Sequence, residues 1–157
     1  MTRAGHGFDA HRLVEGRRLI LAGVEIPFER GALGHSDADV IAHAICDALL
    51  GACALGDLGS HFPEADPQWK DADSMLLLEK CASMVRTAGY RIVNIDATVV
   101  VDRPKLAPFI EAMRENVARH LDLALEFVSV KAKSSEGLGY TGDGTGIAAH
   151  AAVSVER

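Results

Sequence analysis

The segment from Val40 to Leu55 restricts the fold more than any other part of the sequence. Apolar residues dominate it, and only His43 and Asp47 carry polar side chains, four residues apart and so on one face of a helix. A helix that is apolar on nearly every side has to be buried. We therefore expect a central helix that other elements cover, opened by Ser36 as its N-cap.

Residues 90–102 alternate between apolar and polar side chains with the period of a β-strand. The odd positions from Val93 to Val101 are apolar, whereas the even positions include Asn94, Asp96 and Thr98. One face of this strand should therefore belong to the core, and the other should remain partly polar.

Patterns along the rest of the chain predict a layered fold. We expect a strand at 3–9, a hairpin or strand pair at 19–27, helices at 71–88 and from about 109 to 122, and strands at 127–133 and 147–155. Residues 1–157 are then one domain of α/β (α+β) class, with a mixed β-sheet and three helices packed on one face. The other sheet face needs cover, and a partner subunit is its expected source.

Composition excludes several classes of protein. The net charge of −6 argues against a surface for nucleic acid or anionic membranes. The sequence contains no run of 18 apolar residues, the length that a membrane-spanning helix needs. Its N-terminal residues do not show the charged-then-apolar pattern of a signal peptide. The three cysteines, Cys46, Cys53 and Cys81, form no C-x-x-C pair and indicate reduced, buried thiols. We expect a cytoplasmic protein.

Three residues suggest a metal site. Asp9 and His11 are two residues apart, so both point to the same side of an extended strand. His43 would add an imidazole from the buried helix, and Asp47 could orient it. Three protein ligands with one open position are typical of catalytic zinc. Each residue alone also has an ordinary explanation, such as a polar strand edge or a hydrogen-bonded helical histidine.

Several loops carry groups suited to phosphate or sugar. His35 and Ser36 precede the expected helix, whose free N–H groups favour an anion. The run 131–139 combines lysines, hydroxyls and Glu136, which can hold phosphate oxygens and a hard cation. The rigid loop 102–108 can cradle a base or a diphosphate, and Asp57 with residues 62–66 can bind sugar hydroxyls. Plain capping and solvated turns are the alternatives.

Motifs spread over the whole chain carry a family resemblance. They are Gly5–His11, Gly34–Val40, Asp47–Ala52, Ala54–Gly59, Phe62–Pro63, Asp71–Ser74 and Glu136–Gly142. Together they resemble the 2-C-methyl-D-erythritol 2,4-cyclodiphosphate synthase family of the non-mevalonate isoprenoid pathway. The resemblance implies a homotrimer with active sites between neighbouring subunits. It also implies metal-dependent cyclisation of 4-diphosphocytidyl-2-C-methyl-D-erythritol 2-phosphate to the 2,4-cyclodiphosphate, with release of CMP.

The resemblance also implies the functional residues. Zinc, one ion per subunit, falls on Asp9, His11 and His43, and Glu136 matches the ligand of a second ion, Mg²⁺ or Mn²⁺, on the substrate diphosphate. Catalytic contacts to the transition state fall on His35 and Ser134. Substrate contacts fall on Asp9, His11, His35, Ser36, Asp57, Leu58, Gly59, Phe62, Pro63, Glu64, Ala65, Asp66, Pro104, Lys105, Leu106, Ala107, Lys133, Ser134, Ser135, Glu136 and Tyr140.

One position departs from the family pattern. Family members often carry Arg where this chain has Asp143, and in some of them that Arg lines a cavity on the trimer axis that binds isoprenoid diphosphates. Three Asp143 carboxylates would repel such an anion. We therefore expect no isoprenoid diphosphate there, and tight farnesyl diphosphate binding by calorimetry would contradict this expectation.

Two other functions remain open on the residues alone. One is a metal-dependent phosphohydrolase, in which the open metal position activates water. The other is a trimeric binding module stabilised by zinc, which would have a closed four-ligand site. Cyclisation itself needs no strong general base, because the attacking phosphate is already an anion and phosphoryl transfer depends mainly on positioning and electrostatics.

Overall fold

A computed structural model describes residues 1–157. One mixed sheet has the strand order β4-β1-β7-β5-β6. Its strands are β1 (Thr2–Glu15), β4 (Arg30–Ala32), β5 (Arg91–Val100), β6 (Val128–Lys133) and β7 (Gly146–Glu156). Only β5 and β6 pair in parallel, whereas the other neighbours are antiparallel. A separate hairpin joins β2 (Leu19–Leu21) to β3 (Val24–Ile26).

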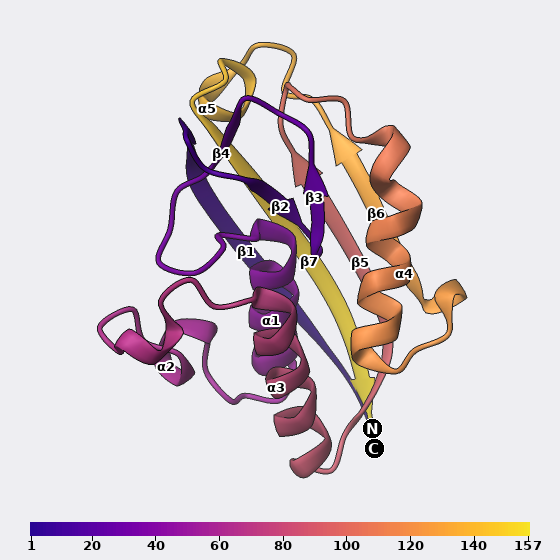
Figure 1. The fold of residues 1–157 in the computed structure, drawn as a ribbon. Helices are drawn as coiled ribbons and strands as arrows, with labels where there is room; N and C mark the ends of the chain where they lie inside the picture. Colours follow the sequence, from indigo (N-terminus) through magenta and orange to yellow (C-terminus); the bar gives the residue numbers. More distant parts are fainter.

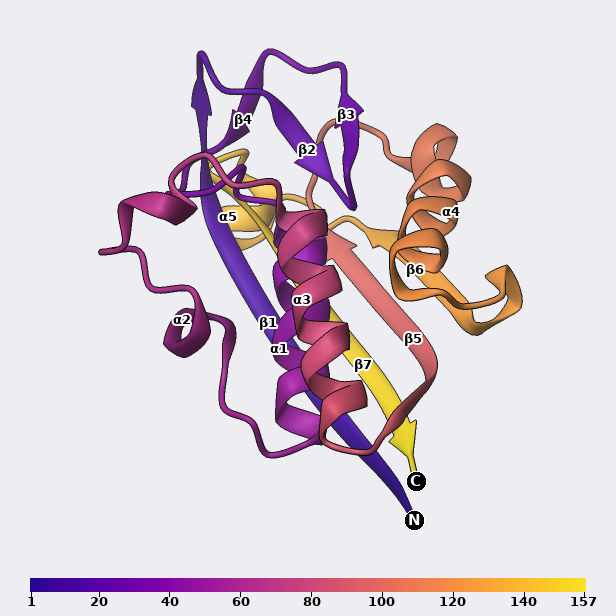
Figure 2. The same cartoon turned by 60° about the horizontal axis from the view of Figure 1, so that its bottom comes forward.

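The long helices cover one face of this sheet, as predicted. Helix α1 (Val40–Ala52) lies against β1 and β7, α3 (Ser74–Thr87) lies against α1, and α4 (Ile110–Leu121) lies beside β6 (Figure 1). Two four-residue helices, α2 (Leu58–His61) and α5 (Gly139–Gly142), were not predicted. Figure 2 shows α2 well to the side of α1 and α3. No helix is long and apolar enough to cross a bilayer.

Two glycines of β1 let α1 lie directly on the strand backbone. A Cβ at Gly7 would lie 1.9 Å from the Ala44 carbonyl oxygen, and one at Gly5 would lie 1.9 Å from that of Ala48. Side chains of a strand alternate between its faces, so Asp9 is the next residue that points toward α1. The glycines therefore bring the helix close enough for one of its side chains to reach Asp9.

Helix α1 is buried along nearly its whole length, as predicted, but its expected start was wrong. The cap is Asp39, whose Oδ1 accepts the Ala42 N–H at 3.0 Å, and not Ser36. Ala38 has a φ of 57°, a left-handed conformation that interrupts any helix running from Ser36. Asp39 is fully buried and also accepts the N–H groups of Ala22 and Gly23.

The strand alternation is confirmed with one break. Ile95, Ala97 and Val99 are buried, but a bulge inserts Val93 into the pairing with β7, so Ile92 faces the core. β1 extends to Glu15 rather than ending at residue 9, and β4 was not predicted.

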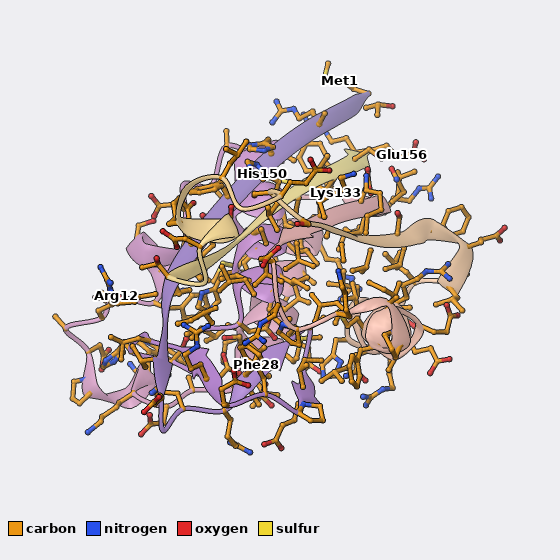
Figure 3. The ribbon with its side chains drawn as sticks, turned by 90° about the horizontal axis from the view of Figure 1, so that it is seen from above. Met1, Arg12, Phe28, Lys133, His150 and Glu156 are labelled. Atoms are coloured by element: carbon orange, nitrogen blue, oxygen red, sulfur yellow. The ribbon has the colours of Figure 1, made fainter.

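The cysteines are buried and free, as expected. His150 lies in the mostly apolar strand β7, which by itself suggests a core or interface residue. The structure excludes the core, because His150 is exposed, and Figure 3 places it on the side of the sheet away from α4. Its Nδ1 lies 3.2 Å from His6 Nε2. Residues at even positions of β1 alternate outward, so the two histidines share the uncovered face with Phe8, which is 46% exposed.

Candidate functional site

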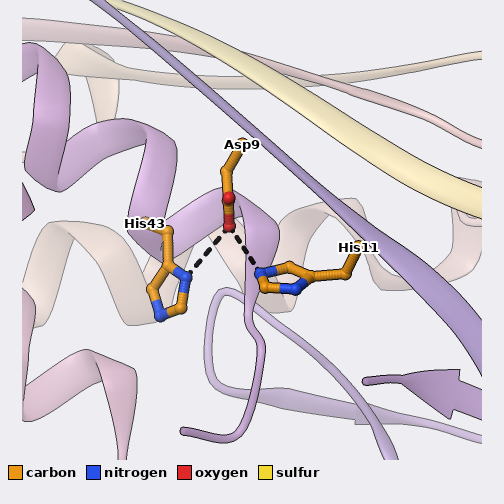
Figure 4. Close-up of side chains that lie close together, drawn as sticks. All are labelled: Asp9, His11 and His43. Atoms are coloured by element: carbon orange, nitrogen blue, oxygen red, sulfur yellow. Dashed lines mark hydrogen bonds and ion pairs between the residues drawn. The ribbon is translucent and has the colours of Figure 1, made fainter. Parts of the chain in front are cut away.

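Asp9, His11 and His43 converge at one point, as the sequence predicted (Figure 4). Asp9 Oδ2 lies 2.9 Å from His11 Nε2 and 2.9 Å from His43 Nδ1. β1 supplies the first two residues, and α1 supplies the third. One oxygen and two nitrogens within 4.8 Å of one another form a donor set that suits a divalent ion.

The outer nitrogens of both imidazoles already have partners. His11 Nδ1 lies 2.9 Å from the Leu33 carbonyl oxygen, which can only accept a hydrogen bond. His43 Nε2 lies 2.8 Å from Ser74 Oγ, whose own proton goes to Asp37. Both outer nitrogens therefore donate, and both inner nitrogens face the Asp9 carboxylate. A proton or a metal ion has to lie between each inner nitrogen and that carboxylate, so these residues fit a metal cation.

Electrostatics at the site agree with a cation. Burial alone raises the pKa of Asp9, but hydrogen bonds and positive charge from His11 and His43 lower that pKa from 3.8 to about 2. Burial lowers the pKa of His43, yet the Asp9 carboxylate outweighs it and raises that pKa overall. Asp9 is thus ionised at neutral pH and attracts a proton or a metal ion into the space between the rings.

A cavity of about 200 Å³ opens at the three residues. Six further residues that the sequence assigned to substrate line it, namely His35, Ser36, Leu58, Gly59, Phe62 and Glu64. Ser36 Oγ lies 3.2 Å from His43 Nε2, so this residue contacts a candidate ligand although it does not cap the helix. His35 Nε2 lies 3.4 Å from the Asp66 carbonyl oxygen.

The role predicted for Asp47 is not the one in the structure. Its Oδ1 accepts the Leu58 N–H at 2.7 Å and anchors the start of α2, whereas Ser74 and Ser36 meet the outer nitrogen of His43. Asp57, also predicted at the sugar side, caps α2 by accepting the Ser60 N–H at 2.9 Å. Neither Asp57 nor the exposed Pro63 and Ala65 lines the cavity.

The predicted nucleotide residues gather in a second pocket. Its lining includes Pro104, Lys105, Leu106, Ala107, Lys133 and Ser134, and it shares no residue with the cavity at the metal candidates. Ser134 Oγ donates to Asp102 Oδ1 at 3.1 Å and accepts the Glu136 N–H at 2.9 Å. Within one chain, the two groups of predicted substrate residues therefore line separate pockets.

The other predicted residues of this loop come after Ser134 in the sequence and do not line the second pocket. Glu136 is exposed and has a φ of 51°. Ser135 Oγ lies 2.5 Å from Thr141 Oγ1, and Tyr140 lines a shallow pocket beside His11. Asp143 accepts the Thr145 N–H at 2.9 Å, and hydrogen bonds from Thr145 lower the pKa of Asp143.

Sequence reasoning missed several residues of the cavity. Trp69 and Leu77 line it, and the Trp69 ring meets Phe62 edge-on with ring centroids 5.0 Å apart. Ser74, the first residue of α3, belongs to the motif Asp71–Ser74, and its residue type alone indicates no role in a metal site. Its contact with His43 spans 31 residues of sequence, and no local pattern announces such a contact.

Comparisons with known proteins agree with one another. The YgbB family profile matches residues 2–156. A 2-C-methyl-D-erythritol 2,4-cyclodiphosphate synthase from Trichlorobacter lovleyi is 60% identical over 151 residues, 96% of each chain. The solved bifunctional IspDF from Campylobacter jejuni has a TM-score of 0.95 and 42% identity, over 99% of this chain and 42% of that one. A CDP-bound 2C-methyl-D-erythritol-2,4-cyclodiphosphate synthase has a TM-score of 0.91 and 38% identity, over 98% of this chain and 100% of that one.

Proposed function

The chain belongs to the YgbB family of 2-C-methyl-D-erythritol 2,4-cyclodiphosphate synthases, and from that premise we propose how its own residues catalyse the reaction. The enzyme converts 4-diphosphocytidyl-2-C-methyl-D-erythritol 2-phosphate to the 2,4-cyclodiphosphate and CMP in isoprenoid precursor biosynthesis. The 2-phosphate oxygen forms a bond to the β-phosphorus, and the bond from that phosphorus to the bridging oxygen breaks. CMP leaves with that oxygen and its electron pair.

Asp9, His11 and His43 hold zinc in this proposal. The observation that carries it is the convergence of one carboxylate oxygen and two imidazole lone pairs beside a cavity. Zinc bound there would supply Lewis-acid chemistry and a template that aligns the attacking phosphate. Glu136 has an exposed carboxylate of the kind that hard ions prefer, and it would hold Mg²⁺ or Mn²⁺ against the substrate diphosphate.

His35, Ser36 and Ser134 contact the reacting phosphates in this proposal. His35 and Ser36 line the cavity beside the metal candidates, where an N–H or O–H can donate to a phosphate oxygen. Ser134 lies in the second pocket with Lys133, which can balance the charge of a leaving nucleotide. Fixed donors of this kind stabilise charge that grows during phosphoryl transfer without requiring a base.

We propose that the working enzyme is a homotrimer. The substrate must reach from the metal candidates to the nucleotide pocket, yet these two cavities have no residue in common within one chain. Pairing the first cavity of one subunit with the second pocket of its neighbour would complete the site. We further propose that residues 1–157 act as one catalytic domain in the cytoplasm, which suits three free thiols.

The products of the reaction test the proposal. The protein is incubated with the cytidine-diphosphate substrate, Zn²⁺ and Mg²⁺, and ³¹P NMR follows the phosphorus signals. We expect the cyclic diphosphate and CMP in equal amounts. Release of inorganic phosphate instead would favour the phosphohydrolase, whose metal activates water. Lys105→Ala should raise KM, because it weakens binding of the nucleotide part of the substrate. Asp9→Asn should remove turnover, because it removes a ligand of the metal.

A further inference from the structure

We propose that Ser74, oriented by Asp37, is a positioning residue that fixes the ring of His43 for metal binding. The proposal rests on the metal site described above. It adds two residues to that site, neither of which touches substrate or metal. Ser74 acts only through His43, and Asp37 acts only through Ser74.

Asp37 determines what the hydroxyl of Ser74 can do. Asp37 Oδ1 accepts the Ser74 hydroxyl proton, and Asp37 Oδ2 accepts the Ser74 backbone N–H at 3.0 Å. These two bonds hold the first residue of α3 against the loop that precedes α1. Ser74 has no exposed surface, so no water competes for its hydroxyl. The hydroxyl can therefore only accept from His43, whose Nε2 lies 2.8 Å away.

This direction of the hydrogen bonds sets the tautomer of His43. In the neutral ring the proton sits on Nε2, which leaves the Nδ1 lone pair directed at Asp9 Oδ2, 2.9 Å away. Neutral imidazole binds a metal only through a nitrogen that carries no proton, and the partner of the other nitrogen decides which one that is. In the series Asp37–Ser74–His43, the carboxylate thus acts on the metal-ligand candidate through the hydroxyl between them.

Ser36 cannot replace Ser74 in this role. Its Oγ lies 3.2 Å from His43 Nε2 and accepts the Ala38 N–H at 3.2 Å, but no carboxylate holds its proton. A hydroxyl with a free proton can either donate to the imidazole or accept from it. Without Ser74, both tautomers of His43 therefore become accessible, and one of them places a proton where the metal should bind.

Metal affinity tests the proposal apart from turnover. We expect Ser74→Ala to weaken zinc binding about 10- to 100-fold in competition with a chromophoric chelator, the usual cost of losing an outer partner of a ligand. Ser74→Thr keeps the hydroxyl and should restore most of the affinity. Ser60→Ala is the matched control, because that serine makes capping bonds in α2 and does not contact the three metal candidates. It should bind zinc as tightly as the wild type.

The tautomer of His43 gives a second measurement that needs no substitution. Long-range ¹H–¹⁵N NMR of the wild-type protein distinguishes protonated from unprotonated ring nitrogens, and we expect the proton on Nε2. An unprotonated Nε2, or equal zinc affinity for wild type and Ser74→Ala, would overturn the positioning role and leave the metal site standing. A wild-type protein that binds no zinc would overturn the metal site and this role together.

Discussion

At the scale of single residues, His43 makes the sharpest prediction. His43→Ala should remove bound zinc and nearly all turnover, because one of three ligands is lost. The fold should survive, since alanine favours a helix. His120→Ala is the control. That histidine lies in α4, an element that supplies none of the metal candidates, and it donates to the Asn116 carbonyl oxygen at 2.8 Å. Zinc content and turnover are measured on the same sample. A His43→Ala variant with full turnover and no bound zinc would contradict the ligand assignment.

Asp39 predicts how stability depends on pH. Burial, with the nearby Asp37 charge, raises its pKa from 3.8 to about 6 despite three backbone N–H donors. An acid with a raised pKa binds its proton more tightly in the folded chain. Its contribution to stability is therefore full below about pH 4 and is lost as the pH rises through 6. The loss is on the order of 3 kcal/mol, from about 1.4 kcal/mol per unit.

Urea unfolding at several pH values measures this contribution. Asp39→Asn removes the titration, so the difference in unfolding free energy between wild type and variant should change in favour of the variant between pH 4 and 7. The variant loses one side-chain oxygen that accepts a backbone N–H, and it does so at every pH, which gives a constant offset. A difference that stays flat over this range would show that the carboxyl does not titrate there.

At the scale of elements, the contact of α1 with β1 depends on glycine. Gly7→Ala would place a Cβ 1.9 Å from the Ala44 carbonyl oxygen, so the helix must move away from the strand. We expect a loss of about 1–3 kcal/mol in unfolding free energy and weaker zinc binding, because His43 moves with α1. Gly51→Ala is the control on the same helix, where no atom lies within 4 Å of the new Cβ. It should be neutral or stabilising by up to about 1 kcal/mol.

The same elements show how far the sequence could predict the structure. The apolar length of α1 and the alternation of β5 are local patterns, so they predicted a buried helix and a strand with one core face. The start of α1 depends on Asp39 meeting Ala22 and Gly23 of the hairpin, a contact between distant segments. Ser36 and Asp39 are equally good caps by residue type, and the non-local contacts of Asp39 decide between them.

In the candidate site, too, local patterns were predictable and contacts between distant segments were not. The alternation of side chains along a strand predicted that Asp9 and His11 point to the same side, and the polar positions of α1 indicated His43 as the third ligand. The partners of their outer nitrogens were not predictable, because the Leu33 carbonyl carries no side-chain signal and Ser74 approaches from another helix. Residues that bind a metal can be recognised by their residue type. Residues that orient those ligands can be identified only once the fold is known.

At the scale of the whole molecule, the uncovered sheet face makes the last prediction. Phe8 is 46% exposed on that face beside His150, their ring centroids 4.9 Å apart, while the helices lie on the other side. A partner subunit that covers this face would bury Phe8, and light scattering should then give three times the chain mass of 16.7 kDa. Phe8→Asp should lower the mass toward one chain and remove turnover, because the two pockets lose their pairing. Zinc binding should persist, since one chain supplies all three ligands.

Leu76→Asp separates this effect from a general loss of apolar surface. Leu76 is 52% exposed on α3, which lies on the helical side, so the variant should remain trimeric and active. If Phe8→Asp remained trimeric with full turnover, another surface would have to join the subunits. If it became monomeric yet kept full turnover, each chain would bind its whole substrate alone, and the shared site would be wrong. Loss of mass and turnover together, with zinc retained, is the result that a site built between subunits requires.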